Sequence, residues 1–171
     1  MECDLEDIET PYLRRLFAYW QSKLRGRTCP SRRDLDPREF AFALGHVLLI
    51  DVLENPQRFR FRLHGSVLSF RARYDMTGRL VDELPNDENR AVLLQRCRKL
   101  VETRQPCFAR SRRLVDGLMY GYEVVWMPLS SDAEKVDMLL GGLAYFDDPM
   151  RMARATPREA VLVASRVPVP A

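Results

Sequence analysis

The sequence predicts an α+β domain in which a five-stranded antiparallel β-sheet carries helices on one face and follows an N-terminal amphipathic helix. Segments with strand-like patterns form a group of two and a later group of three, and segments with helical spacing precede and separate these groups. Strands grouped in this way, instead of alternating one by one with helices, are typical of α+β domains. The turns between neighbouring strands are short, which favours antiparallel pairing.

The size and composition of the chain fit a single domain. It has 171 residues, of which 46% are hydrophobic and 30% are charged, and domains usually contain about 100–200 residues. No apolar run approaches the roughly 18 residues that a membrane span needs. The N-terminus is acidic, where a secretory signal is basic and then apolar. We therefore expect a cytoplasmic protein with no membrane span.

The first predicted element is an amphipathic helix. Thr10 is a suitable N-cap, Pro11 fits the first helical position, and Gly26 supplies a stop. Two interpretations of its apolar stripe stay open: an interface with a second copy of the chain or a signalling partner, or a cover for the chain's own sheet. The stripe consists of Leu13, Leu16, Phe17, Trp20 and Leu24.

A short helix and a hairpin follow. An aspartate-proline pair predicts a helix over residues 36–44. Residues 46–53 and 58–64 predict two strands, and because apolar and basic side chains alternate along the second one, we expect one of its faces to be buried. Residues 66–74 predict another short helix, and a turn then leads to a brief segment at residues 80–84.

A long helix and three strands complete the core. Asn86 or Asp87 caps the helix, and Pro106 ends it. Asp116-Gly117 is a strong hairpin signal, and Gly141-Gly142, inside the last strand, indicates close packing. The predicted strands span residues 107–115, 118–130 and 137–146, which divides the chain into a helical leader (1–45), a core (46–147) and a tail with a short helix (148–171).

The cysteines and histidines form no recognisable catalytic or metal-binding motif. Cysteines at positions 3, 29, 97 and 107 include no Cys-x-x-Cys pair, so we expect reduced, buried thiols and no metal site. His46 and His64 belong to neighbouring strands, where haem ligation or pH sensing competes with an ordinary role in the sheet. No glycine-rich phosphate loop is present. The sequence therefore predicts a protein that is not an enzyme.

Charge is distributed unevenly along the chain. The net charge is +3, but residues 90–113 hold eight basic residues and one acidic residue, whereas residues 116–148 hold one basic and seven acidic residues. Such segments form either ordinary solvated faces or a basic surface for nucleic acid or an acidic partner. No helix-turn-helix or RNA-binding motif supports the nucleic-acid hypothesis.

Several short motifs carry a family resemblance: Tyr19-Trp20, Arg25-Gly26, the leader Pro30–Pro37, Phe61–Ser66 and Asp75–Arg79. With the order of two strands, several helices and three strands, they resemble the PAS superfamily. Within it, they are similar to a bacterial group of short stand-alone PAS proteins. The resemblance extends from Leu13 to Phe146. The chain departs from the pattern at Ser66, where Thr is commoner, and at an extra Arg33.

The resemblance implies a sensory or regulatory protein that pairs with a partner, or with itself, through the leader helix. It also implies a pocket for a small molecule between the sheet and the helices, with ordinary core packing as the alternative. The other functions considered are a ligand-free dimerisation adaptor and a nucleic-acid-binding protein. The sequence identifies no cofactor, since the Asn-Cys-Arg-Phe motif of flavin photosensors is absent. The candidate pocket residues are Arg62, His64, Tyr122, Trp126 and Tyr145.

Overall fold

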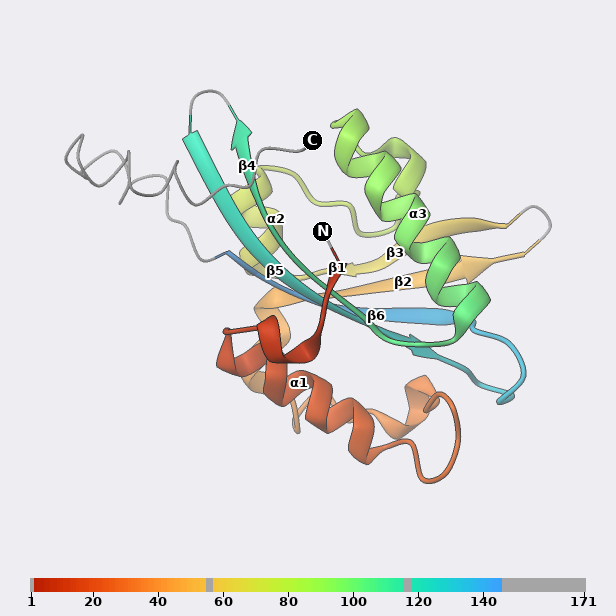
Figure 1. Cartoon of the computed structure of the whole chain (residues 1–171). Coiled ribbons are helices and arrows are strands. Elements are labelled where there is room, and N and C mark those ends of the chain that lie inside the picture. The colour runs from red at the N-terminus through yellow and green to blue at the C-terminus, as the bar shows by residue number, and fades with distance from the viewer. Residues whose placement is uncertain (1, 55–56, 116–117, 146–171) are drawn as a thin grey trace.

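The structure is a computed structural model that describes residues 2–54, 57–115 and 118–145 (Figure 1). Part of the link between the first two predicted strands (Asn55-Pro56), the hairpin tip at Asp116-Gly117, the strand end at Phe146 and the tail helix lie outside these residues. Within the described ranges, no helix is long and apolar enough to cross a membrane.

An antiparallel sheet lies at the centre of the molecule (Figure 1). Its strand order is β1-β4-β5-β6-β2-β3, so β2 and β6, far apart in the sequence, are neighbours. An additional edge strand, β1 (Glu2–Cys3), pairs with β4 and was not predicted, because two residues are too few to show an alternating pattern. The five predicted strands are all present as β2 (Val47–Leu53), β3 (Arg58–His64), β4 (Cys107–Val115), β5 (Leu118–Leu129) and β6 (Met138–Tyr145).

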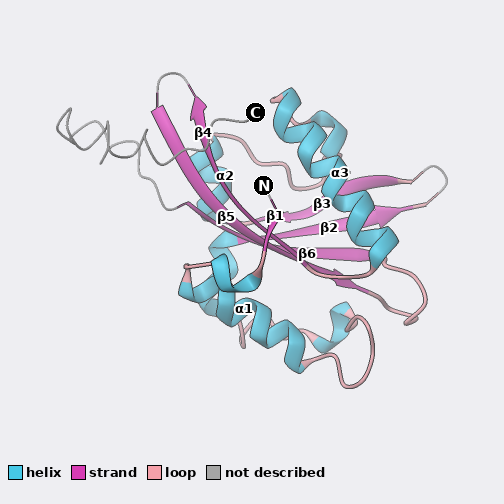
Figure 2. Ribbon diagram, viewed as in Figure 1, coloured by secondary structure: helices cyan, strands magenta, loops and turns pink. Residues whose placement is uncertain are grey.

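In the part of the chain that the structure describes, three α-helices accompany the sheet: α1 (Pro11–Ser22), α2 (Ser66–Ala72) and α3 (Asp87–Thr103) (Figure 2). Asn86 caps α3, since its side chain accepts a hydrogen bond of 2.8 Å from the backbone N–H of Asn89. The helix predicted over residues 36–44 is instead a turn followed by the 3₁₀ helix η3 (Ala41–His46). The brief segment predicted at residues 80–84 contains the 3₁₀ helix η4 (Val81–Glu83).

The helices lie on both faces of the sheet, with α1 on one face and α2, η4 and α3 on the other (Figures 1 and 2). The alternation of side chains along β5 divides the core in the same way. Val125 and Met127 pack in the α1 layer, whereas Val124 and Trp126 pack in the α3 layer. The helices of the core therefore share one face, as predicted, and the leader helix covers the opposite one.

Two adjacent glycines on β6 allow both layers to approach the sheet closely. A Cβ atom on Gly141 would lie 2.6 Å from the ring of Trp126, and a Cβ atom on Gly142 would lie 2.7 Å from a methyl group of Leu16. Both distances are shorter than real Cβ contacts. The close packing predicted for this pair is confirmed: Gly141 makes room for an indole ring, and Gly142 makes room for α1.

The apolar stripe of α1 covers the chain's own sheet. Leu13 and Leu16 are fully buried, Phe17 and Trp20 are 5% and 2% exposed, and the partly buried Leu24 packs against the same cluster. The second of the two interpretations of the stripe therefore describes this structure. While α1 is docked, its four buried side chains are not accessible to a partner.

Polar contacts also fasten the leader to the sheet. Glu123 of β5 is 1% exposed, and its carboxylate accepts hydrogen bonds from the backbone N–H groups of Glu9 and Thr10 at 3.0 and 2.9 Å. The indole N–H of Trp20 donates to the carbonyl of Pro128 at 3.1 Å. These contacts hold the start and the end of α1 against β5.

Candidate ligand-binding cavity

A cavity of about 360 Å³ lies between the sheet and helices α2 and α3. Its volume falls in the range of about 300–1,000 Å³ that is usual for small-molecule sites. The cavity has a largely apolar floor on the sheet and a roof that carries charged and polar groups. Its lining consists of Leu48, Arg71, Ala72, Tyr74, Leu84, Asn89, Val92, Leu93, Arg96, Tyr122, Val124, Trp126, Leu143 and Tyr145.

Three of the five predicted pocket residues form part of the floor. Tyr122 and Trp126 are four residues apart and therefore lie on the same face of β5, and Tyr145 on β6 is the register partner of Tyr122. Trp126 is 2% exposed and is register partner to Gly141, which leaves space for its ring. The alternation of β5 and β6 therefore brings all three aromatic side chains to one wall.

The indole N–H of Trp126 has no hydrogen-bond partner among the described residues. Within the described residues, only this nitrogen and Nε of Arg104 are buried side-chain polar atoms without one. The other tryptophan of the chain, Trp20, has its N–H paired with a carbonyl. A buried, unpaired N–H costs about 1–3 kcal/mol. A ligand or a water molecule with an acceptor oxygen would recover this free energy at Trp126.

The roof of the cavity comes from one side of α3 and from the end of α2. Asn89, Val92, Leu93 and Arg96 recur at helical spacing on α3, so they face the same side. On α2, the guanidinium of Arg71 lies over the ring of Tyr145, 4.4 Å from its centroid. This cation–π contact links roof and floor.

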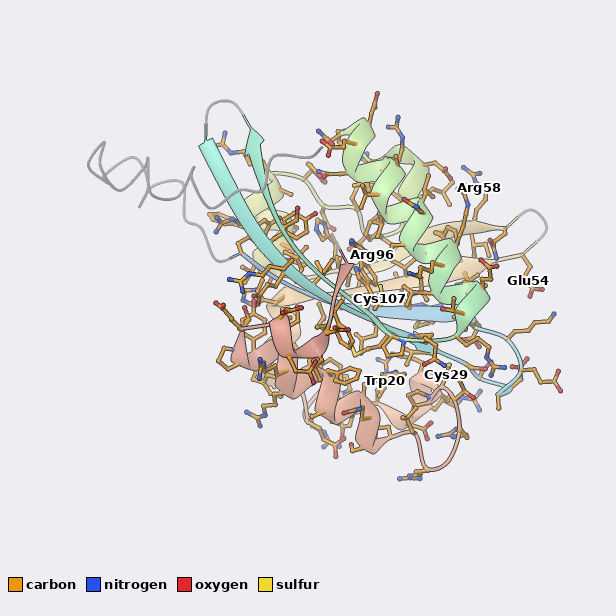
Figure 3. All side chains as sticks on the ribbon, in the orientation of Figure 1. Trp20, Cys29, Glu54, Arg58, Arg96 and Cys107 are labelled. Carbon is orange, nitrogen blue, oxygen red and sulfur yellow. The ribbon has the colours of Figure 1, made fainter. Side chains whose placement is uncertain are left out.

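Arg96 is the half-buried cation of this roof. Figure 3 shows its side chain extending from α3 toward the sheet. Within the described part of the chain, Arg96 makes no hydrogen bond or ion pair, whereas Arg90 of the same helix pairs with Asp87 at 2.8 Å. Among the residues that the structure describes, no carboxylate lines the cavity.

Arg62 and His64 do not line the cavity. Arg62 lies on the opposite face of β3 from the buried Phe61, and its Nε donates to the carboxylate of Asp51 at 2.7 Å. His64 accepts a hydrogen bond of 3.2 Å from the backbone N–H of Met76. Its ring packs beside Tyr74, a lining residue, at a centroid distance of 6.2 Å. The sequence indicated polar side chains on β3. It did not predict that Arg62 and His64 have hydrogen-bond partners within the protein.

Burial shifts the pKa of several groups near the core. It lowers the pKa of His64, and the nearby Asp75 carboxylate opposes this shift. It raises the pKa of Tyr74 and of the Cys29 and Cys97 thiols. Cys29, Cys97 and Cys107 are free thiols, and the first two are buried. In the described residues, no group of three or more His, Cys, Asp or Glu side chains is arranged to hold a metal ion.

The roof residues were not predicted from the sequence, because the aromatic pattern of the strands indicates only the floor. The recurrence of Asn89, Leu93 and Arg96 at intervals of four and three residues is the signal that could have found them. No comparable pattern points to Arg71 or Tyr74. These two residues reach the cavity only because α2 and the turn after it fold back over the sheet.

Several comparisons with known proteins give matches. Among solved structures, a light-oxygen-voltage domain aligns with a TM-score of 0.48 at 15% identity, over 72% of this chain and 93% of that one. The PAS domain of BvgS from Bordetella pertussis aligns with a TM-score of 0.49 at 12% identity, over 72% and 90%. A sensory box histidine kinase/response regulator from Burkholderia thailandensis E264 aligns with a TM-score of 0.40 at 16% identity, over 77% and 100%.

Comparison of the sequence with protein-family models identifies the family of the chain. No curated protein sequence gives a significant match. A family model described as PAS domain matches residues 8–144, which include the leader helix α1 and all but the last residue of the described core. Since this match covers most of the chain, the protein belongs to the PAS domain family.

Proposed function

We propose that this PAS domain is a sensory and regulatory module that acts through contact with another protein, and that a small molecule in the cavity biases this contact. The observation that carries the proposal is the cavity of about 360 Å³ with the unpaired indole N–H of Trp126 in its wall. Apolar walls with a few convergent polar groups suit a small organic ligand. The family assignment supports a regulatory role.

The route from ligand to surface runs through elements that the cavity shares with the rest of the molecule. Helix α2 contributes Arg71 and Ala72 to the lining, and it also carries Phe70, whose side chain is 87% exposed. On β5, Trp126 lies between Val125 and Met127, which pack in the α1 layer. A ligand that prefers one position of α2 or Trp126 shifts the population of surface conformations that a partner meets.

Nucleic-acid binding is less well supported by the geometry. The arginines of β3 are paired with acidic side chains: Arg60 and Arg62 with Asp51 at 3.1 and 2.7 Å, and Arg58 with Asp82 at 3.2 Å. Pairing lowers the positive charge that this strand offers to phosphate groups.

Native mass spectrometry of the purified wild-type protein tests the ligand. We expect a complex that exceeds the mass of the chain by one small molecule and loses it on denaturation. Val92→Phe places a phenyl group at the cavity wall and should lower the occupancy, whereas Ala91→Phe adds the same group at an exposed neighbouring position and should not.

A wild-type mass equal to that of the chain, with no stabilisation by any added ligand, contradicts the ligand-binding part of the proposal. The protein would then act as a ligand-free interaction adaptor. Equal occupancy in Val92→Phe and in wild type would place the bound molecule outside this cavity.

A further inference from the structure

We infer that the cavity takes a small organic carboxylate whose charged group is held by Arg96 and whose acceptor oxygens also satisfy the indole N–H of Trp126. The inference rests on the proposed function, because it names the chemical class of the ligand of the same cavity. It goes further by assigning the charge of the ligand and the two side chains that bind its charged group.

The charge balance of the lining is the first observation. Arg71 and Arg96 both line the cavity, and no aspartate or glutamate within residues 2–54, 57–115 and 118–145 does. Arg71 already lies over the ring of Tyr145. Arg96 is half-buried and has no acceptor among the described residues. A partly desolvated cation without a counter-ion is unfavourable, so the site is stabilised by an anion.

Two other arginines of the chain pair with carboxylates, and they show what Arg96 lacks among the described residues. Arg27 pairs with Asp34 at 2.6 Å, and Arg90 pairs with Asp87 at 2.8 Å. In both pairs the carboxylate belongs to the chain itself. At Arg96 the described lining supplies none, and a bound molecule would supply the missing partner.

The second observation is the donor on the opposite wall. Trp126 lies on β5 and is 2% exposed, while Arg96 reaches the cavity from α3. An indole nitrogen only donates, and a guanidinium only donates. Both side chains therefore require acceptors and reject ligand N–H groups. A carboxylate has two acceptor oxygens and binds a guanidinium in a bidentate arrangement.

The remaining lining decides between classes of anion. Leu48, Val124 and Leu143 form apolar floor, which suits an apolar body. Arg71 is engaged with the ring of Tyr145, so Arg96 and the Trp126 N–H are the two donors that a single carboxylate would satisfy. The volume of about 360 Å³ lies near the lower end of the usual range, so the acid is small.

The two tryptophans of the chain make a direct experiment possible. In ¹⁵N-labelled wild-type protein, each indole N–H gives its own resonance, which Trp126→Phe assigns. We would titrate indole-3-acetate, 4-hydroxybenzoate and octanoate, each against its neutral amide. We expect an acid to move the Trp126 resonance, while the resonance of Trp20, already bonded to Pro128, stays in place.

Variants of α3 test the role of Arg96. Arg96→Gln should weaken binding of the acid by about 10- to 100-fold, the usual effect of losing a charged hydrogen bond, and Arg96→Lys should weaken it less. Arg98→Gln removes the same charge from an exposed position on the same helix and should leave the affinity unchanged.

The outcomes separate the inference from the proposed function. An amide that binds as tightly as its acid, or an affinity unchanged in Arg96→Gln, overturns the carboxylate inference while the cavity remains a ligand site. If no acid or amide moves the Trp126 resonance, and native mass spectrometry finds no bound molecule, both the inference and the ligand-binding function are overturned.

Discussion

Replacing Glu123 with alanine tests whether a buried carboxylate fastens the leader to the sheet. Its two oxygens accept the backbone N–H groups of Glu9 and Thr10 at 3.0 and 2.9 Å. Arg110 lies beside it, with Nε 3.5 Å from one oxygen. Glu123→Ala removes both acceptors at once.

The size of the effect follows from the number and burial of these bonds. Hydrogen bonds to charged groups contribute about 1.5–3 kcal/mol each. Glu123 is 1% exposed, but Glu9 and Thr10 are not buried, so water can partly replace the lost acceptor and the lower value applies. We therefore expect the free energy of unfolding to fall by about 3 kcal/mol. In a chain of this size the melting temperature would fall by about 6–12 °C.

Urea denaturation followed by circular dichroism measures this loss. Glu123→Gln keeps one acceptor oxygen, so about half of the destabilisation is expected. Glu9→Gln is the matched control, because it also removes a carboxylate partner of Arg110, at 2.7 Å, but from a side chain that is 72% exposed. Exposed ion pairs contribute about 0–1 kcal/mol. A Glu123→Ala protein as stable as Glu9→Gln would refute the role assigned to the buried carboxylate.

Three further predictions concern packing, pH and thiol reactivity. Gly142→Ala places a methyl group against a leucine of α1 and should destabilise the protein by about 1–3 kcal/mol in urea denaturation; wild-type stability would contradict the close approach. Because burial lowers the pKa of His64 below its usual 6.5, the unfolded chain takes up this proton first, so stability should fall as the pH drops through 6.5. His64→Asn, which keeps an acceptor, should make the pH dependence of unfolding shallower, and an unchanged slope would count against it. Cys29 and Cys97 should resist alkylation in the native protein and react in denaturant, as peptide mass spectrometry would show; rapid native labelling of either thiol is the contrary result.

The strands of the core were predictable because their signal is local. Alternation of Phe59 and Phe61 with arginines marks one buried face of β3, and the Gly141-Gly142 pair indicates close packing within β6. The same periodicity identified Tyr122, Trp126 and Tyr145 as side chains of one face. It also placed Arg62 on the other face, although this residue was predicted in the pocket for its polarity.

The roof of the cavity was harder to predict because it depends on long-range packing. Arg96 and Arg71 come from two helices separated by residues 73–86, which form turns and a short 3₁₀ helix. Their charges alone do not distinguish them from exposed arginines such as Arg98. What distinguishes Arg96 is its half-buried position above the sheet and the lack of a partner there, and both are properties of the assembled layers.

The sequence by itself determined which residues form strands and helices and which side of each element is apolar, since both are recorded in the spacing of side chains along the chain. It left open what the apolar stripe of α1 would cover. Tertiary structure decided this, through the fit of Leu16 against Gly142 and the hydrogen bonds that join Glu123 to residues 113 and 114 positions earlier. Periodicity shows that a face is buried, but contacts between distant residues decide which surface buries it.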